Sequence, residues 1–210
     1  MVDKNIKGDL FIVSSPAGGG KTTLVNLLIE EIPNIKRAIT CTTRKPRPGE
    51  IPGKDYIFLS KQEFEERIRK DEFLEYAVVH GNYYGTPKKE VFEILNQGID
   101  LILVIDVQGM KQIKQNYKEA ITIFILPPSL DTIVQRMKKR GDSEEEIRKR
   151  LETAKKEIPQ WKYYDFIVIN DILEKAKEDL KHIILSNRLK TKRFDINQIK
   201  DEKLKKLLMI

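Results

Sequence analysis

The chain has 210 residues, of which 40% are hydrophobic and 34% are charged, and its formal net charge is +7. This length predicts one domain, or one domain with small insertions, and the apolar content excludes a long disordered chain. No apolar run approaches the ~18–20 residues of a membrane span, and one cysteine with two histidines argues against a disulfide framework or a Cys/His metal site. We therefore expect a cytoplasmic protein without a signal peptide or a membrane partner.

The positive charge is concentrated near the C-terminal end. Residues 188–210 include eight basic and three acidic residues, a net charge of +5, which leaves only +2 for residues 1–187. A nearly neutral body without a recognised nucleic-acid motif argues against a nucleic-acid partner, which the net charge alone would suggest. We expect residues 191–210 to form a basic, solvated tail outside the domain, and the sequence assigns no role to it.

In chain order, short apolar β-rich runs alternate with segments of helical periodicity. Strands are predicted at residues 9–14, 35–40, 101–105, 121–126 and 166–169. Helices are predicted at residues 21–31, 88–96, 129–139, 144–157 and 173–189. This alternation predicts an α/β fold with a mostly parallel sheet flanked by helices.

Residues 42–86 break this alternation, and we expect a small α+β insertion there. They begin with a loop rich in proline and glycine at 44–54. The elements predicted after it are strands at 56–59, 73–79 and 82–84, with a helix at 61–70. Ligands of parallel sheets bind beyond the carboxyl ends of the strands. Three loops that follow strands should therefore meet in one crevice: 15–21, 44–48 and 106–109.

The segment from Ser14 to Thr23 reads S-S-P-A-G-G-G-K-T-T, follows a predicted strand and opens a helix. It matches the phosphate loop G-x-x-x-x-G-K-[ST], with Ser15 in place of the first glycine. Glycines let the backbone wrap a phosphate, Lys21 reaches the β- and γ-phosphates, and the Thr22 hydroxyl can ligate Mg²⁺. The segment predicts a bound nucleoside triphosphate with Mg²⁺; the alternative is a flexible glycine turn. The residues predicted to bind ATP in this segment are Ser15, Pro16, Ala17, Gly18, Gly19, Gly20, Lys21, Thr22 and Thr23.

Three further segments bear on the group that accepts the phosphate. Arg44 and Arg47 lie in a proline-stiffened loop and can form bidentate contacts with a phosphate; the alternative is an ordinary basic surface loop. Glu75 could accept two N–H groups from the Watson–Crick edge of guanine, or could be an ordinary strand residue. Asp106 ends the strongest predicted strand, where an acid often serves Mg²⁺ or its waters; the alternative is the N-cap of a following helix.

Together these segments resemble the guanylate kinase family, and the resemblance runs from about Gly8 to about Leu189. The phosphate loop, the TTRxPRxGE stretch, the GNYYGT turn and the IDxQG strand end occur in the family's order and spacing. The resemblance implies phosphorylation of GMP by ATP with Mg²⁺ (ATP + GMP = ADP + GDP), in purine nucleotide metabolism. It also implies a P-loop NTPase-type parallel sheet flanked by helices, within a guanylate kinase-like domain at 1–190. The parts of that domain would be a core at 8–41, 87–136 and 151–190, a GMP-binding insertion at 42–86 and a helical lid at 137–150.

The resemblance also implies roles for the residues that match the family's motifs. For the GMP phosphate they are Arg44, Arg47, Tyr56 and Tyr84. For guanine they are Thr40, Glu75, Thr86 and Asp106. For catalysis they are Lys21, Arg136, Arg140 and Arg150. Near the adenine of ATP they are Asn170 and Asp171. For Mg²⁺ they are Thr22 and Asp106.

One position departs from the family, and two other functions remain open. Many members have an acid two residues before the position of Asp106, where this chain has Val104, so Mg²⁺ would depend on Thr22, Asp106 and the phosphates. The alternatives are a P-loop kinase for another nucleoside monophosphate and a non-catalytic binding module of the same fold. The presence of Lys21 and the lid arginines argues against the binding module. A homo-oligomer is compatible with the sequence.

Overall fold

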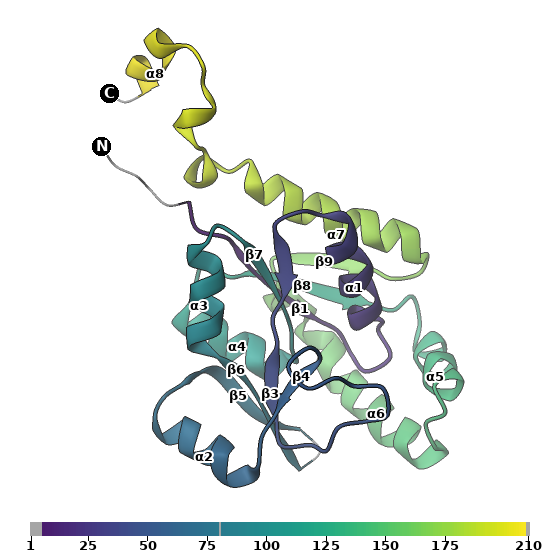
Figure 1. Cartoon of the computed structure of the whole chain (residues 1–210). Helices are drawn as coiled ribbons and strands as arrows, with labels where there is room; N and C mark the ends of the chain where they lie inside the picture. Colours follow the sequence, from purple (N-terminus) through teal and green to yellow (C-terminus); the bar gives the residue numbers. More distant parts are fainter. Residues whose placement is uncertain (1–5, 80, 209–210) are drawn as a thin grey trace.

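Figure 1 shows the protein as a computed structural model, which describes residues 6–79 and 81–208. A five-stranded parallel sheet forms the centre, in the order β2-β7-β1-β8-β9. Its strands are β1 (Leu10–Ser14), β2 (Ile35–Arg37), β7 (Asp100–Val104), β8 (Ile121–Leu126) and β9 (Phe166–Ile169). All five residues of β1 are buried, because helices cover both faces of the sheet, and this explains its unbroken apolar run.

Two pairs of helices form the outer layers of this sandwich. On one face lie α1 (Lys21–Glu31) and α7 (Leu173–Arg188), whose buried side chains pack in one cluster with Phe11 and Val13 of β1. On the other face lie α3 (Lys88–Asn96) and α4 (Val107–Asn116), which pack with Leu10 and Ile12. The expected α/β fold with a flanked parallel sheet is confirmed. Helix α4 was not among the predicted elements, although an N-cap role was an alternative for Asp106.

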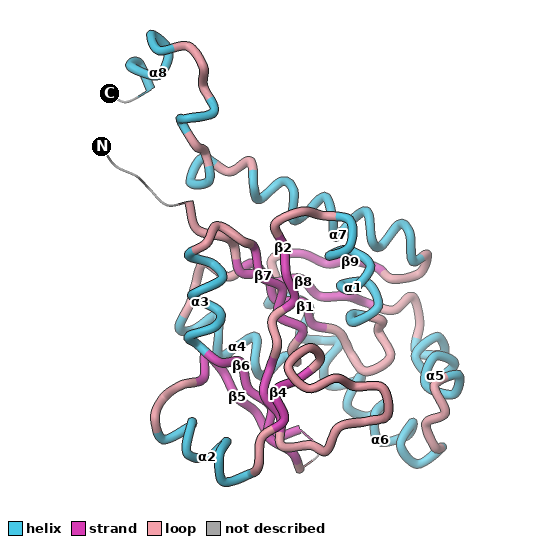
Figure 2. The backbone as a smooth tube through the Cα atoms, in the orientation of Figure 1, coloured by secondary structure: helices cyan, strands magenta, loops and turns pink. Residues whose placement is uncertain are grey.

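A second, four-stranded sheet has the order β4-β3-β6-β5, and the strands of both sheets are drawn in magenta in Figure 2. Its strands are β3 (Thr40–Thr42), β4 (Tyr56–Phe58), β5 (Phe73–Val79) and β6 (Asn82–Pro87), and α2 (Lys61–Arg69) packs on it. The Phe64 ring of α2 stacks between Phe73 and Tyr83, with ring centroids 4.3 and 5.0 Å apart. The predicted single strand at 35–40 is wrong. The chain leaves the main sheet after the Ala38 N–H bonds the Ile102 carbonyl, and it enters the second sheet at Thr40.

A helical pair, α5 (Leu130–Lys139) and α6 (Glu144–Glu157), lies beside the main sheet. Ser129 caps α5, and Ser143 forms a capping box with Glu146 at the start of α6. The pair has its own small core, in which Met137 and Ile147 are buried and Ala17 of the phosphate loop packs against them. The predicted helices at 129–139 and 144–157 are therefore confirmed to within one residue. A 3₁₀ helix, Ile158–Tyr163, connects α6 to β9.

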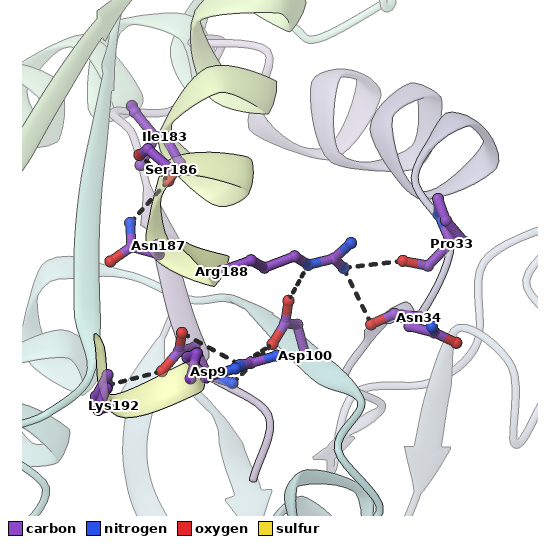
Figure 3. Close-up of polar contacts among 10 residues, drawn as sticks. Asp9, Pro33, Asn34, Asp100, Ile183, Ser186, Asn187, Arg188 and Lys192 are labelled. Carbon is purple, nitrogen blue, oxygen red and sulfur yellow. Dashed lines mark hydrogen bonds and ion pairs between the residues drawn. The ribbon is translucent and has the colours of Figure 1, made fainter. Parts of the chain in front are cut away.

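The C-terminal segment after α7 is only partly a solvated tail. Two acids, Asp9 before β1 and Asp100 at the start of β7, are 5% and 0% exposed. Arg188 binds Asp100 at 2.8 Å, and Lys192 binds Asp9 at 2.8 Å (Figure 3). The Arg193 Nη1 lies 2.7 Å from Asp100 Oδ1 and 3.2 Å from Asp9 Oδ2. We call these five residues the C-terminal clamp.

The clamp corrects the expectation that the whole of 191–210 lies free of the domain. The contacts are made because two carboxylates buried side by side need cations, and Arg188 at the end of α7 supplies one while Lys192 and Arg193 just after it supply the others. Beyond the clamp, residues 194–208 run away from the body and end in α8 (Glu202–Leu208) (Figure 1). Residues 209–210 of the predicted tail lie outside the described residues. Within the described chain, no helix has both the length and the apolar character needed to cross a membrane.

Replacing Arg193 by Ala should lower the free energy of unfolding by about 1.5–3 kcal/mol, since the two buried carboxylates lose the cation they share and each keeps one cation, Arg188 or Lys192. Urea unfolding at pH 7 measures this change. The control is Lys206→Ala on α8, where the side chain is exposed and the change should stay within about 0.5 kcal/mol. Equal stabilities of the two variants would contradict a clamp that contributes to folding.

Candidate active site

The phosphate loop connects β1 to α1 and takes its shape from its glycines. Gly18 and Gly20 have φ angles of 78° and 89°, a region that L side chains rarely adopt. A Cβ on Gly19 would lie 2.7 Å from the Ser15 side chain, so only glycine fits there. Gly20 is the N-cap of α1, and the helix therefore begins at Lys21 with its N–H groups directed at the loop. Such a loop is suited to binding an anion.

Two residues from distant parts of the chain hold this loop in place. The side-chain amide of Asn170, which is 3% exposed, donates to the Gly19 carbonyl at 2.9 Å. Arg136 of α5 donates to the Gly19 carbonyl at 3.4 Å and to the Asn170 carbonyl at 2.9 Å. Both residues thus contact the phosphate loop itself. Asp171, the next residue in the chain, is exposed and lies outside the lining of the neighbouring cavity.

Lys21 lies where three regions of the site meet. Burial lowers the pKa of its ammonium, while the carboxylates of Glu157 and Asp106 act in the opposite direction. Arg140 and Arg150 lower this pKa further. Lys21 is therefore an ammonium held among protein atoms, with both carboxylates and guanidinium groups around it.

Glu157, the last residue of α6, is a site residue that the sequence did not identify. Burial raises the pKa of its carboxyl to about 7, with Asp106 adding to the rise and Lys21 and the Ala17 N–H opposing it. The residue has no motif around it, and α6 brings it to the phosphate loop across more than 130 positions of sequence. No local sequence signal could have placed it there.

A buried carboxylate marks the pocket between the main sheet and the second sheet. Glu75 on β5 is 5% exposed, and the Thr86 hydroxyl on β6 donates to its Oε1 at 2.6 Å. A Cβ on Gly109 would lie 2.7 Å from Glu75 Oε2, so α4 can approach β5 only because it has glycine there. Burial raises the pKa of Glu75 to about 7; Asp106 adds to this rise, and the Thr86 contacts lower it.

Arg44 and Arg47 follow β3 in the proline-containing loop. The side chain of Arg44 is paired within the protein, whereas Arg47 is exposed. The guanidinium of Arg44 forms a bidentate pair with Glu50, with N–O distances of 3.0 and 2.8 Å. It also lies over the Tyr56 ring, with 5.4 Å between its Cζ and the ring centroid. The Tyr84 hydroxyl contributes, after Glu50, to a raised pKa of Arg44. Arg47 is exposed and lines a cavity.

The two arginines that follow α5 share one carboxylate. Arg140 hydrogen-bonds Asp142, with 3.0 Å between its Nε and Asp142 Oδ1, and Arg150 Nε lies 3.7 Å from Asp142 Oδ2. Arg140 holds the pKa of Asp142 below its usual range, and Arg150 and Arg47 contribute. Arg47 belongs to the loop that follows β3 of the second sheet. The electrostatic potential at Asp142 therefore combines charges from this loop and from the α5–α6 pair. Asp142 was not identified from the sequence, although it is only two residues from Arg140.

Three cavities adjoin at Lys21 and Thr22. The first, about 410 Å³, is lined by the phosphate loop with Thr23, Arg136, Arg140 and Asn170. The second, about 150 Å³, contains Lys21, Thr40, Tyr56, Glu75, Tyr84, Val104 and Asp106. The third, about 200 Å³, contains Thr22, Thr40, Arg47, Glu50, Tyr56 and Val104. Shared residues connect them: Lys21 lines the first two, and Thr22 the first and third. The expected crevice is therefore present in the structure.

Some predicted residues lie behind this lining. Pro16, within the loop, is buried, and Ala17 packs against the α5–α6 core. Thr86 is buried, and its hydroxyl is hydrogen-bonded to Glu75. Arg44 faces Glu50.

The oxygen atoms available to Mg²⁺ are few. Thr22 lines the first and third cavities, and Asp106 lines the second. The Asp106 Oδ1 accepts the Gly109 N–H at 2.9 Å and caps α4, so the capping alternative is present in the structure. Among residues 6–79 and 81–208, no group of three or more acids, histidines or cysteines could hold a metal. A hydroxyl and a carboxylate fit a hard cation such as Mg²⁺, which binds through one or two protein ligands when phosphates supply the others.

Comparison with known proteins agrees with this geometry. The sequence profile described as "Guanylate kinase" matches residues 7–187. A guanylate kinase from Carboxydothermus hydrogenoformans is 48% identical over 188 residues, which cover 89% of this chain and 92% of that protein. A guanylate kinase from Neisseria gonorrhoeae is 50% identical over 188 residues, with the same two coverages. The crystal structure of guanylate kinase from Anaplasma phagocytophilum superimposes with a TM-score of 0.74, at 32% identity and 90% coverage of each chain. The phosphate loop, the buried Glu75 and these matches over nearly the whole domain lead to one conclusion: the chain belongs to the guanylate kinase family.

Proposed function

We propose that this protein transfers the γ-phosphoryl group of ATP to the phosphate of GMP, forming ADP and GDP. The observation that carries the proposal is the junction of three cavities at the neighbouring residues Lys21 and Thr22, one cavity beside the phosphate loop, one around the buried Glu75 and one beside Arg47. This arrangement suits two nucleotides that meet phosphate to phosphate. No feature of the site favours another nucleoside monophosphate or a non-catalytic binding module.

For ATP, we propose that the loop 15–20 and Lys21 bind the phosphates and that Thr23 contributes at the helix start. Asn170 and Arg136 keep the loop in its binding shape through the Gly19 carbonyl. The adenine would lie near 170–171. Thr22 and Asp106 would hold Mg²⁺, which supplies charge neutralisation between the β- and γ-phosphates when it is bound.

For GMP, we propose that the Glu75 carboxylate accepts two N–H groups of guanine, with Thr40, Thr86 and Asp106 completing the pocket. Arg44, Arg47, Tyr56 and Tyr84 would bind the phosphate. The acceptor oxygen needs no general base, because the second pKa of a phosphate monoester is ~6 and the oxygen is ionised near neutral pH. Catalysis is then positioning and charge stabilisation.

The parts of the chain would divide this work. We propose that residues 42–86 are the GMP-binding insertion and that 137–150 are a lid whose arginines turn from Asp142 to the transferring phosphoryl group. Closure would also exclude water, which would otherwise hydrolyse ATP. We propose a cytoplasmic location, where both substrates occur.

The acceptor panel tests the function directly. ADP formation from Mg·ATP should be strong with GMP and weak with AMP, CMP, UMP and dTMP, and Lys21→Ala should abolish it. Preference for another acceptor would contradict the role of Glu75 while leaving the phosphate loop in place. A folded protein that binds ATP but uses no acceptor would favour the binding module.

Replacing Glu75 by Gln should lower kcat/KM for GMP by about 10²–10⁴-fold, because one acceptor oxygen becomes an NH2 donor and the other hydrogen bond loses its charged acceptor. The pKa of about 7 adds a pH dependence, since only the ionised carboxyl accepts both N–H groups. The KM for GMP should therefore rise as the pH falls below about 7 in the wild type. The titration of the GMP phosphate is common to both proteins, so the wild-type to Glu75→Gln ratio of kcat/KM across pH isolates Glu75. A ratio independent of pH would contradict this role.

Arg150→Met should lower kcat by about 10³-fold or more with a small change in either KM, since a stabilising arginine acts mainly on the transition state. Lys149→Met is the matched control, because Lys149 is the exposed neighbour paired with Glu145 on the helix surface. Steady-state kinetics with both substrates varied measures the difference. A loss confined to KM would assign Arg150 to ground-state binding.

A further inference from the structure

Glu50, which has no role in the proposed function, holds the Arg44 side chain in place. The two carboxylate oxygens of Glu50 accept from Nη1 and Nη2 of Arg44 at 3.0 and 2.8 Å. Both side chains are mostly buried, at 15% and 19% exposure. A bidentate pair of this kind fixes the plane of the guanidinium as well as its position.

The donors of Arg44 show which part of the guanidinium remains for a ligand. Nη1 also donates to the Lys45 carbonyl at 2.7 Å, so both of its N–H groups are used. Nη2 uses one N–H for Glu50. A guanidinium has five N–H groups. The Nε–H and the second N–H of Nη2 lie along the remaining edge of the plane. The Tyr84 hydroxyl also interacts with this guanidinium, and the edge has the geometry to bind two phosphate oxygens at once.

Glu50 also fixes the loop that carries Arg47. Its Oε2 accepts the Arg47 backbone N–H at 2.7 Å, and its own N–H donates to the Arg47 carbonyl at 3.1 Å. Gly49 has a φ of 86°, which allows the turn from 47 to 50. One carboxylate therefore sets the positions of both arginines relative to each other.

The rings beside Arg44 restrict it further. Its Cζ lies 5.4 Å from the Tyr56 centroid and 5.9 Å from the Phe58 centroid. Tyr56 and Tyr84 lie edge to face, with centroids 6.2 Å apart. The guanidinium is thus fixed by a carboxylate on one edge and by aromatic rings beside it.

We propose that Glu50 is a positioning residue for the acceptor phosphate: it occupies one edge of Arg44 and thereby presents the other edge, together with Arg47, to the phosphate of GMP. This inference rests on the proposed function. Glu50 reduces the positive charge of the phosphate site by one unit. Its benefit therefore comes from orientation: the entropy cost of ordering Arg44 is met in the free protein, before the ligand binds. A carboxylate that merely competed with the phosphate would have the opposite effect on affinity.

The two effects predict opposite results for Glu50→Gln. If Glu50 positions Arg44, the KM for GMP rises about 10–100-fold, as expected for loss of a charge-assisted hydrogen bond. The kcat and the KM for ATP stay within about threefold of wild type, because the phosphate loop is untouched. A KM for GMP that falls or stays constant would overturn the proposal.

Two further variants make the comparison specific. Glu66→Gln on α2 is the matched control, since Glu66 pairs with Lys70 at 2.7 Å on an exposed helix face, and its kinetic constants should equal those of wild type. Arg44→Lys removes the guanidinium edges. In that background Glu50→Gln should cost less than threefold in KM for GMP, because the two residues act as a unit. Full additivity of the two substitutions would overturn the proposal.

A measurement without catalysis separates this inference from the proposed function. The Nε–H signal of Arg44 in ¹⁵N NMR, assigned by its loss in Arg44→Lys, should be resolved in the ligand-free protein and should shift with inorganic phosphate. In Glu50→Gln it should move toward the position of free arginine, and the phosphate affinity should fall. This result would support the positioning role even if the protein did not phosphorylate GMP. An unchanged Arg44 signal in Glu50→Gln would overturn it.

Discussion

A site that binds polyphosphate must keep its cations apart from one another before any phosphate is present, and this constraint accounts for much of the structure. Each of the main cations has a partner within the protein: Arg44 has Glu50, Arg140 and Arg150 have Asp142, Lys21 has Glu157 and Asp106, and Arg136 has two backbone carbonyls. These partners neutralise like charges that would otherwise repel at short range. They also hold the side chains in defined orientations, so less ordering remains for the moment of binding.

The fold supplies these partners from separate layers. The phosphate loop and Asp106 come from carboxyl ends of neighbouring strands of the main sheet, where α/β folds gather their ligands. The arginine–glutamate pair comes from the second sheet, and the α5–α6 pair adds Asp142 and Glu157. Close approach of these layers depends on single residues such as Gly109, where any side chain would meet the Glu75 carboxylate.

The sequence predicted the parts of the site whose chemistry requires given residue types at fixed spacing. The phosphate loop, the arginine pair, Glu75 and most helix boundaries are of this kind, and the strands of the main sheet follow from their apolar runs. The rest depends on contacts between distant segments. Periodicity could not show that residues 35–42 divide between two sheets, since each strand has only three residues, Ile-Lys-Arg and Thr-Cys-Thr, which is too short to show a pattern. In the sequence, Glu157, Asp9 and Asp100 are indistinguishable from ordinary charged residues at the end of a helix or strand. Their contacts with Lys21 and with Arg193 form only when distant segments of the chain come together.

The C-terminal clamp has a consequence for the connectivity of the fold. Arg193 binds Asp9, so the segment that closes the folded body lies directly beside the segment that opens it, although 184 positions of sequence separate them. Folded domains whose ends meet tolerate circular permutation. A short linker between the clamp and residue 7, with new ends opened in the exposed turn at Gly53, would give a chain of different order with the same sheets. In such a permuted chain the linker would join covalently the two segments that the clamp now holds by ion pairs, and the contacts of the active site would be independent of where the chain starts.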